Sequence, residues 1–277
     1  MAKSQAAGPI KKSHQVAIAG AFILLIYLPT FIWMWERWFA RDSYYSHGIL
    51  VPFVTLYLIW LKKDVLKAIK PQPSKWGMRL FFLGIGVHLL SACFRVYFTS
   101  GFSLIIVLFG LALYFYGTKT LKEILFPLSF LAFMVPLPLV LVANISFKLK
   151  MFAAHMAVVL LNNMRIVCIQ DGSAIIMRHA YVVVDDVCSG LRSLIALMAL
   201  GSLFAYWMKS SRANKIILFL FSVPIAVMAN VVRIIFLAAV NEIWGSHYAS
   251  GPLHELSGFI VFACAFLLLY TVGKTLE

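Results

Sequence analysis

Residues 216–240 read IILFLFSVPIAVMANVVRIIFLAAV, an apolar run with a single charged residue, Arg233. A helix that crosses the hydrocarbon core of a bilayer needs about 20 consecutive apolar residues, and this run exceeds that length. A charged side chain in hydrocarbon costs about 2.5–3.5 kcal/mol on insertion scales, so it is retained where it has a function. The run therefore predicts a membrane-spanning helix, and it marks Arg233 as a candidate functional residue.

The composition of the whole chain also indicates a membrane protein. Of its 277 residues, 62% are hydrophobic and 12% are charged, whereas soluble domains average about 45–50% apolar and about 25% charged residues. Most of the basic residues behind the net charge of +14 fall in short gaps between apolar runs, as in cytoplasmic loops. No aromatic-basic strand or recognition-helix pattern accompanies them, so we expect no nucleic-acid partner.

We predict an all-α polytopic membrane protein that forms a single membrane domain over residues 1–277. Its parts are about eight transmembrane helices, an outer amphipathic helix and a short β-hairpin. The second span is short, so seven spans are the alternative count. The expected spans cover residues 16–35, 48–61, 78–98, 101–117, 124–143, 188–208, 216–240 and 253–272.

The short loops predict the orientation. Every short loop that would face inward, at 62–79, 118–123 and 209–215, carries Lys or Arg. By the positive-inside rule, both termini then face the cytoplasm.

The segment 144–187 differs from the spans on either side of it. Its first part, Ile145 to Ile166, mixes lysine, histidine and asparagine with apolar residues, which predicts an amphipathic helix along the outer interface. Its second part, Cys168 to Val187, is rich in Ile, Val and Tyr and is interrupted at Gly172. This part predicts a short β-hairpin that leads directly into Cys188.

The predicted topology places three residues suited to acyl transfer at a similar depth near the outer face. Cys188 opens the sixth span, Arg233 lies in the outer half of the seventh, and His254 opens the eighth. A thiolate attacks carbonyl carbon, an imidazole takes and returns a proton near neutral pH, and a guanidinium stabilises an oxyanion.

Neighbours of Cys188 act on the pKa of its thiol in opposite directions. The start of a helix and Arg192, one turn along on the same face, favour the thiolate. The carboxylates of Asp185 and Asp186 oppose the thiolate unless they point elsewhere.

The same residue types also have structural interpretations. Membrane cysteines usually serve packing, which we expect of Cys93 and Cys264, and Cys168 could pair with Cys188 in an oxidising compartment. His254 could be a polar anchor at the interface, and an arginine near a helix end often snorkels to water. The cysteines form no C-x-x-C pair, so we predict no metal site and no cofactor.

Five motifs resemble, in order and spacing, those of the exosortase/archaeosortase family, over about residues 40 to 265. They are Tyr44-Tyr45-Ser46-His47-Gly48 with Pro52 and Trp60, Val135-Pro136-Leu137-Pro138, Val183 to Leu194 with Cys-Ser-Gly-Leu-Arg-Ser at its end, Asn230-Val231-Val232-Arg233, and Leu253-His254-Glu255-Leu256-Ser257-Gly258.

The resemblance implies a cysteine transpeptidase or cysteine protease of the bacterial inner membrane, with its active site facing the periplasm. It implies Cys188 as the nucleophile, Arg233 as a stabiliser of the oxyanion or substrate, and His254 as the proton shuttle. The implied partners are secreted proteins whose C-terminal sorting signal joins a short motif, a transmembrane helix and a basic tail, typically of the PEP-CTERM type. It also implies a link to exopolysaccharide production, and membrane lipid is the other expected partner.

Four further residues are candidate supporting or substrate-binding groups, namely Arg192, Asn230, Ser189 and His47. His47 is also expected at the outer face beside a span, so it is an alternative to His254 as the base. Its structural interpretation, together with the tyrosines before it, is an anchor in the aromatic belt.

Two other functions remain as alternatives. In a transporter or channel, Arg192, Arg233 and Asn230 would line an anion path, although the sequence has no evident inverted repeat or pair of discontinuous helices. A membrane acyltransferase would use the same cysteine and histidine on a lipid donor. In the favoured function, a thioester on Cys188 is resolved by an amine, giving transpeptidation, or by water, giving proteolysis.

Overall fold

The computed structural model describes residues 9–41, 43–245, 247 and 252–277. These residues are mostly helical and include one three-stranded sheet. Two compact units make up the chain, Met1–Pro136 and Leu137–Glu277. The single membrane domain over residues 1–277 stays a prediction.

The described part of the first unit is helical. Its elements are α1 (Pro9–Ile26), α2 (Leu28–Trp38), η1 (Ser46–Ile49), α3 (Leu50–Leu61), α4 (Lys63–Ala68), α5 (Lys75–Cys93), α6 (Tyr97–Phe115), α7 (Thr118–Phe130) and η2 (Leu131–Met134).

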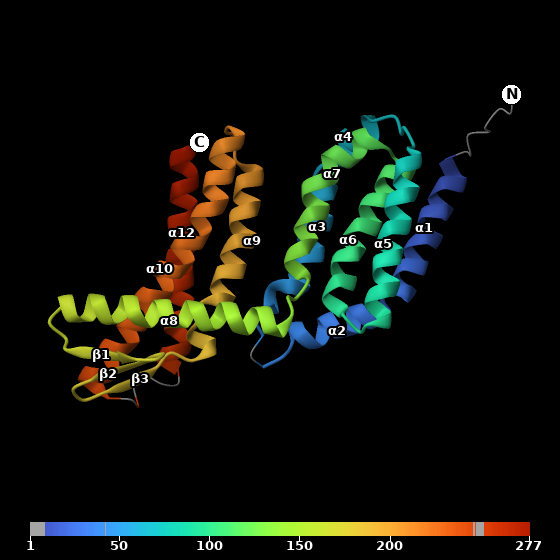
Figure 1. The fold of residues 1–277 in the computed structure, drawn as a ribbon. Coiled ribbons are helices and arrows are strands. Elements are labelled where there is room, and N and C mark those ends of the chain that lie inside the picture. Colours follow the sequence, from blue (N-terminus) through green and yellow to red (C-terminus); the bar gives the residue numbers. More distant parts are fainter. Residues whose placement is uncertain (1–8, 42, 246, 248–251) are drawn as a thin grey trace, which may run out of the picture. The chain divides into compact units, whose positions relative to one another are not determined.

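Basic loops meet at one end of this unit. Lys62 Nζ lies 2.8 Å from Glu123 Oε2, and the backbone N–H of Gln72 donates to the carbonyl of Tyr116 at 3.1 Å. These contacts join the start of α4 to α7, and the α4–α5 loop to the end of α6, near the label of α4 in Figure 1. The two segments of this unit that the charge pattern assigns to the cytoplasm, 62–79 and 118–123, therefore lie at the same end of it.

The predicted first span, 16–35, is bent. Helices α1 and α2 meet at an angle of 63°, and Pro29 in the first turn of α2 has no N–H to continue the helical hydrogen bonds across the bend. Tyr27, at the bend, is fully buried and its hydroxyl lies 2.8 Å from Ser103 Oγ on α6. A polar group in an apolar surrounding needs such a partner, so this hydrogen bond stabilises the bend.

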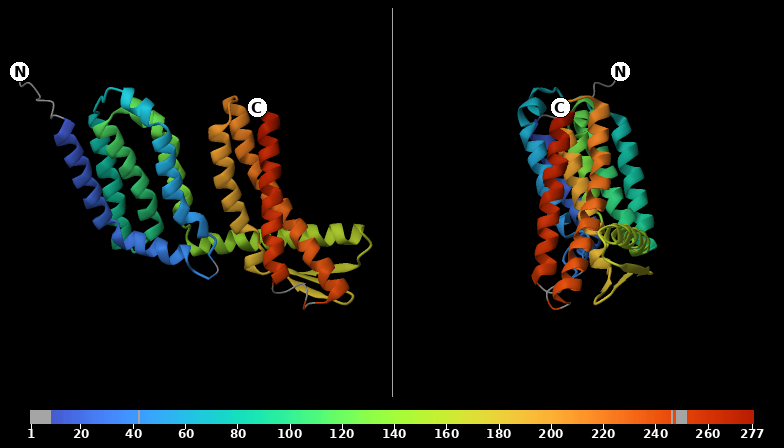
Figure 2. Two further views of the ribbon diagram at one scale, coloured as in Figure 1. Left: turned by 180° about the vertical axis from the view of Figure 1, so that it is seen from behind. Right: turned by 90° about the vertical axis from the view of Figure 1, so that its left-hand side faces the viewer.

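The second unit combines helices with the sheet. Its elements are α8 (Leu139–Asn163), β1 (Cys168–Asp171), β2 (Ala174–Met177), β3 (Tyr181–Val183), η3 (Asp186–Cys188), α9 (Leu191–Trp207), α10 (Arg212–Trp244) and α12 (Pro252–Leu276). Helices α9, α10 and α12 lie side by side, and α8 crosses them at the end where the sheet lies (Figures 1 and 2).

The sheet confirms the predicted hairpin and adds a strand to it. Strands β1 and β2 are antiparallel with Cys168 opposite Met177, and β3 pairs with β2 with Val183 opposite Ala174. Since β3 ends five residues before Cys188, the sheet leads the chain to that cysteine.

The predicted amphipathic helix is α8, which begins at Leu139 instead of Ile145. By length and composition α8 would also pass as a membrane span. It crosses α9, α10 and α12, however, so these four helices cannot all stand upright in one bilayer (Figure 2). If the three parallel helices span the membrane, α8 would lie along the interface, and this placement stays a prediction.

The predicted count of eight spans is not confirmed. Among the described residues, five helices are long and apolar enough to cross a membrane, namely α5, α6, α8, α10 and α12, and the bent pair α1–α2 would be a sixth. The predicted span 124–143 is wrong as one helix, because Pro136 and Pro138 separate η2 from α8. The predicted spans 48–61 and 188–208 are shorter apolar helices, α3 with η1 and α9.

Glycines set the close approach of α5 and α6. A Cβ placed on Gly110 would lie 2.6 Å from the backbone nitrogen of Phe81, and one on Gly77 would collide with the backbone of Tyr114. Small residues let membrane helices approach until their backbones pack. Backbone atoms cannot rotate away as side chains do, so a larger residue would force the helices apart.

We predict that Gly110→Val destabilises the first unit by about 1–3 kcal/mol, the usual cost of overpacking a core. Thermal unfolding of the detergent-solubilised protein measures the effect. Gly86→Val is the control, because a Cβ on Gly86 meets nothing within 4 Å. Equal unfolding temperatures for the two variants would contradict the role given to Gly110.

Candidate active site

Cys188 lies in a tight turn between the sheet and α9. Its backbone N–H donates to the carbonyl of Asp185 at 2.9 Å, and the N–H of Ser189 donates to Asp186 at 3.2 Å. The cysteine side chain is only 9% exposed and packs in the core formed by α8, the sheet and α10. The thiol is therefore held by the fold and is not carried on a loose loop.

A side chain of α10 holds this turn. Asn230 Nδ2 donates to the carbonyl of Cys188 at 2.8 Å, and Asn230 is itself buried. Gly190 follows with φ of +80°, a conformation that L side chains rarely adopt, and a Cβ there would collide with Asn230. The short sequence Cys-Ser-Gly thus lets the turn close directly onto α10.

The imidazole of His254 reaches the thiol from the first turn of α12. Cys188 Sγ lies 3.2 Å from His254 Nε2, within hydrogen-bonding distance for sulfur. Burial raises the pKa of the Cys188 thiol, the charge of Arg233 lowers it, and Asp185 raises it, with a net pKa above the ordinary value. The resting sulfur therefore carries a proton that the imidazole is placed to accept.

Arg233 on α10 is the third residue of the candidate active site, with Cys188 and His254. Its Nη2 donates to the carbonyl of His254 at 3.1 Å, and its Nε donates to Ser257 Oγ at 3.4 Å. A guanidinium has five N–H donors. The two hydrogen bonds to described residues use only some of these donors. Arg233 therefore orients the first turn of α12 and keeps donors for a substrate oxygen.

Ser257 is a site residue that lies in the last of the five motifs, although the sequence alone predicts no role for it. It is buried, accepts from Arg233, and donates to the carbonyl of His254 at 2.8 Å. Its spacing in the sequence could have predicted this role, since a residue three positions after His254 lies on the same face of a helix.

The two carboxylates before Cys188 differ in their surroundings. Lys150 on α8 lies 2.8 Å from Asp186 Oδ1, and Ser146 donates to the same oxygen at 3.3 Å. The Lys150 hydrogen bond holds the pKa of Asp186 below its ordinary value. Asp186 is largely exposed, so this pair contributes less than about 1 kcal/mol to stability. Asp185 is the carboxylate that acts on the Cys188 thiol.

The other predicted site residues lie apart from the thiol or only support its turn. Ser189 is buried, and its Oγ accepts from the N–H of Leu191 at 3.3 Å. Arg192 is exposed, and no hydrogen bond or ion pair between described residues joins it to Cys188. His47 lies in η1 of the first unit, whereas the thiol belongs to the second. The roles of these three residues stay predictions.

All four cysteines are free thiols. The alternative disulfide between Cys168 and Cys188 is therefore not formed, and Cys188 keeps its sulfur for chemistry. Within the described ranges, no group of three or more His, Cys, Asp or Glu side chains could hold a metal ion.

Comparison with known proteins adds one match. A family model described as transmembrane exosortase (Exosortase_EpsH) matches residues 33–271. This range includes Cys188, Arg233 and His254 together with the Asn230 and Ser257 side chains that hold them. No curated protein and no solved structure matches the chain.

We predict that Asp185→Asn lowers the pKa of the Cys188 thiol, because it removes a negative charge that disfavours the thiolate. Alkylation requires the thiolate, so its rate rises as the pH passes through the thiol pKa. The variant should therefore react faster near neutral pH, measured as iodoacetamide labelling of the Cys188 peptide by mass spectrometry.

Asp186→Asn is the matched control. It also removes one negative charge, but from the neighbouring carboxylate, which is already paired with Lys150. Its labelling profile should stay close to that of the wild type. Identical profiles for the two variants would show that Asp185 does not act on the thiol.

Proposed function

Because this chain belongs to the transmembrane exosortase family, we propose that it is a membrane-embedded cysteine transpeptidase or protease acting on C-terminal sorting signals of secreted proteins. The observation that carries the proposal is the 3.2 Å distance between Cys188 Sγ and His254 Nε2. Arg233, which donates a hydrogen bond to the carbonyl of that histidine, supplies the positive charge that stabilises the oxyanion of a peptide-cleavage reaction. These three residues come from three different elements, η3, α10 and α12.

In the first step, Cys188 attacks the carbonyl carbon of the scissile peptide bond. The S–C bond forms as the thiol proton passes to His254 Nε2, and the carbonyl oxygen becomes an oxyanion. Arg233 has donors available to stabilise that oxyanion. When the C–N bond breaks, the leaving amine takes the proton from His254, and a thioester remains on Cys188.

In the second step, an acceptor resolves the thioester. An amine attacks the thioester carbon, the S–C bond breaks, and the proton lost by the amine returns through His254 to the sulfur. This outcome is transpeptidation. Water in place of the amine gives a carboxylate and simple proteolysis. The same histidine acts as base and acid in both outcomes.

The proposed substrates follow from the family together with the position of the site. A secreted protein with a short motif, a transmembrane helix and a basic tail would present the motif where its helix leaves the bilayer. Cys188 lies just before α9 and His254 lies in the first turn of α12, whereas the basic loop and helix start at 209–215 join the other end of α9 to α10. With that loop in the cytoplasm, the thiol faces the periplasm of a bacterial inner membrane, and both termini are cytoplasmic.

The transporter alternative gains no support from the site. It requires Arg192, Arg233 and Asn230 to line one path. Arg192 is exposed, whereas Asn230 is buried and its amide is used on the carbonyl of Cys188. A lipid acyltransferase would share the nucleophile, and it is distinguished by a lipid instead of a peptide on the sulfur.

We predict that Cys188→Ala abolishes processing of a sorting-signal protein while the amount of the membrane protein is unchanged. The reason is that no other described thiol lies beside His254. A mass shift at the substrate's C-terminus, and its absence with the variant, measures the effect. Processing that persists in Cys188→Ala, or a lipid as the group trapped on Cys188, would remove the proposed function.

We predict that His254→Ala slows processing by about 10²–10⁴-fold, the usual contribution of a positioned general base. His47→Ala should retain most of the activity, because His254 Nε2 is already within hydrogen-bonding distance of the thiol and can act as the base. Rates of substrate processing at equal protein levels separate the two histidines. Full activity without His254 would transfer the role of base to another residue.

A further inference from the structure

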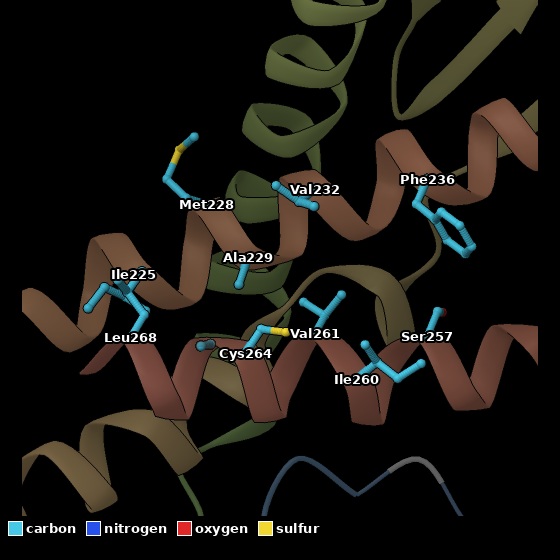
Figure 3. Close-up of a pocket in the computed structure, with 11 residues that line it drawn as sticks. Ile225, Met228, Ala229, Val232, Phe236, Ser257, Ile260, Val261, Cys264 and Leu268 are labelled. Carbon is cyan, nitrogen blue, oxygen red and sulfur yellow. The ribbon is translucent and has the colours of Figure 1, made fainter. Parts of the chain in front are cut away.

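An apolar groove runs between α10 and α12 in the second unit. It encloses about 500 Å³, and Figure 3 shows side chains of both helices directed into the space between them. Its lining residues are Ile225, Met228, Ala229, Val232 and Phe236 on α10 with Ser257, Ile260, Val261, Cys264, Ala265 and Leu268 on α12. No charged side chain is among them, so the groove suits a purely apolar occupant.

The groove has a small-residue floor and a large, exposed rim. Ala229 and Ala265 lie on the floor, whereas Val232, Ile260 and Leu268 on the rim are each more than half exposed. Small residues on a membrane helix allow another helix to approach until the backbones are in contact. The floor and rim therefore have the form of a seat for a helix that arrives sideways from the lipid.

The outer end of the groove is continuous with the proposed active site. Ser257 lines the groove, and the same hydroxyl accepts from Arg233 and donates to the carbonyl of His254. A chain that leaves the groove at Ser257 would therefore meet the arginine and histidine directly. From Ser257 to Leu268 the groove follows about three helical turns, on the order of 17 Å of α12.

We propose that this groove binds the transmembrane helix of the sorting signal, an inference that rests on the proposed function. A helix seated there has its outer end beside Ser257, so the motif just outside the helix falls next to Cys188. The groove thus orients the scissile bond. The motif itself is bound by the polar side chains of the candidate active site at the outer end of the groove. Binding through the helix supplies the positioning that converts a diffusive encounter into a reaction within one complex.

A photo-crosslinking amino acid at Ile260 tests this proposal in native membranes. The chain also carries Cys188→Ala, so that a sorting-signal protein processed by the wild type keeps its helix and stays bound. We expect a covalent adduct between position 260 and the substrate's transmembrane segment. The matched control is the same amino acid at Phe259, which is 76% exposed on α12 but lies outside the groove.

Three results would overturn the docking site. They are substrate adducts of equal yield at positions 259 and 260, an adduct at 260 with lipid alone, and an adduct at 260 with residues 1–136 of the same chain. In each of these cases, wild-type processing that depends on Cys188 would leave the proposed function intact. Processing that survives Cys188→Ala would instead remove the function itself, so the two failures are distinguishable.

A filling substitution gives a second, independent measurement. Cys264→Phe places a bulky ring in the groove and should slow processing at least about fivefold, as overpacked sites generally cost 1 kcal/mol or more. Ala263→Phe, one residue away, exposed and outside the groove, should process as the wild type does. Iodoacetamide labelling of Cys188 should be unchanged in both, showing that the thiol is intact. Equal processing by the two variants would contradict the proposal.

Discussion

A polar group within the apolar part of this protein must find its partner inside the chain, and the structure depends on this constraint. Water is not there to hydrogen-bond it, and an unsatisfied group costs several kcal/mol. The bend at Tyr27 is accompanied by a hydrogen bond to Ser103. The turn at Cys188 is held by Asn230, buried within α10. At Tyr27 the partner satisfies a buried hydroxyl, and at Cys188 it satisfies a backbone carbonyl, and in both places it comes from another helix.

The same constraint explains why the candidate active site is rigid. An unpaired arginine side chain beside lipid costs several kcal/mol. Arg233 donates two hydrogen bonds, one to the carbonyl of His254 and one to the hydroxyl of Ser257. Those bonds fix the first turn of α12, and that turn fixes the imidazole against the sulfur. The arginine thus has a positioning effect in addition to the charge that it offers to a reacting carbonyl. Positioned charge in a water-poor site is worth far more than in solution, because it does not reorganise as the reaction proceeds.

The reaction would take place at a boundary between two environments. Apolar surface on α10 and α12 suits the helix of a substrate, whereas the Cys188 turn and the polar groups around it suit an extended peptide. Helix α8 packs alanines against the core that contains Cys188, and its Lys150 pairs with Asp186. The charge of Asp186, two residues before the thiol, is thereby partly neutralised, which leaves Asp185 as the main opposing charge.

Much of the architecture followed from the sequence, because apolar length and charge placement are local properties. The long apolar helices, the hairpin before Cys188 and the family resemblance were all predicted from it. The number of spans was not, since the bend before Pro29 and the break at Pro136 and Pro138 depend on how neighbouring helices pack. The sequence also predicted that Cys188, Arg233 and His254 lie at a similar depth. Only the tertiary structure decided that the sulfur of Cys188 contacts Nε2 of His254 and that Asn230 and Ser257 hold the two turns. It also decided that Arg192 is exposed and that Asp186 pairs with Lys150. Those outcomes depend on the rotation of each helix about its axis and on contacts between residues far apart in the chain, which no local pattern encodes.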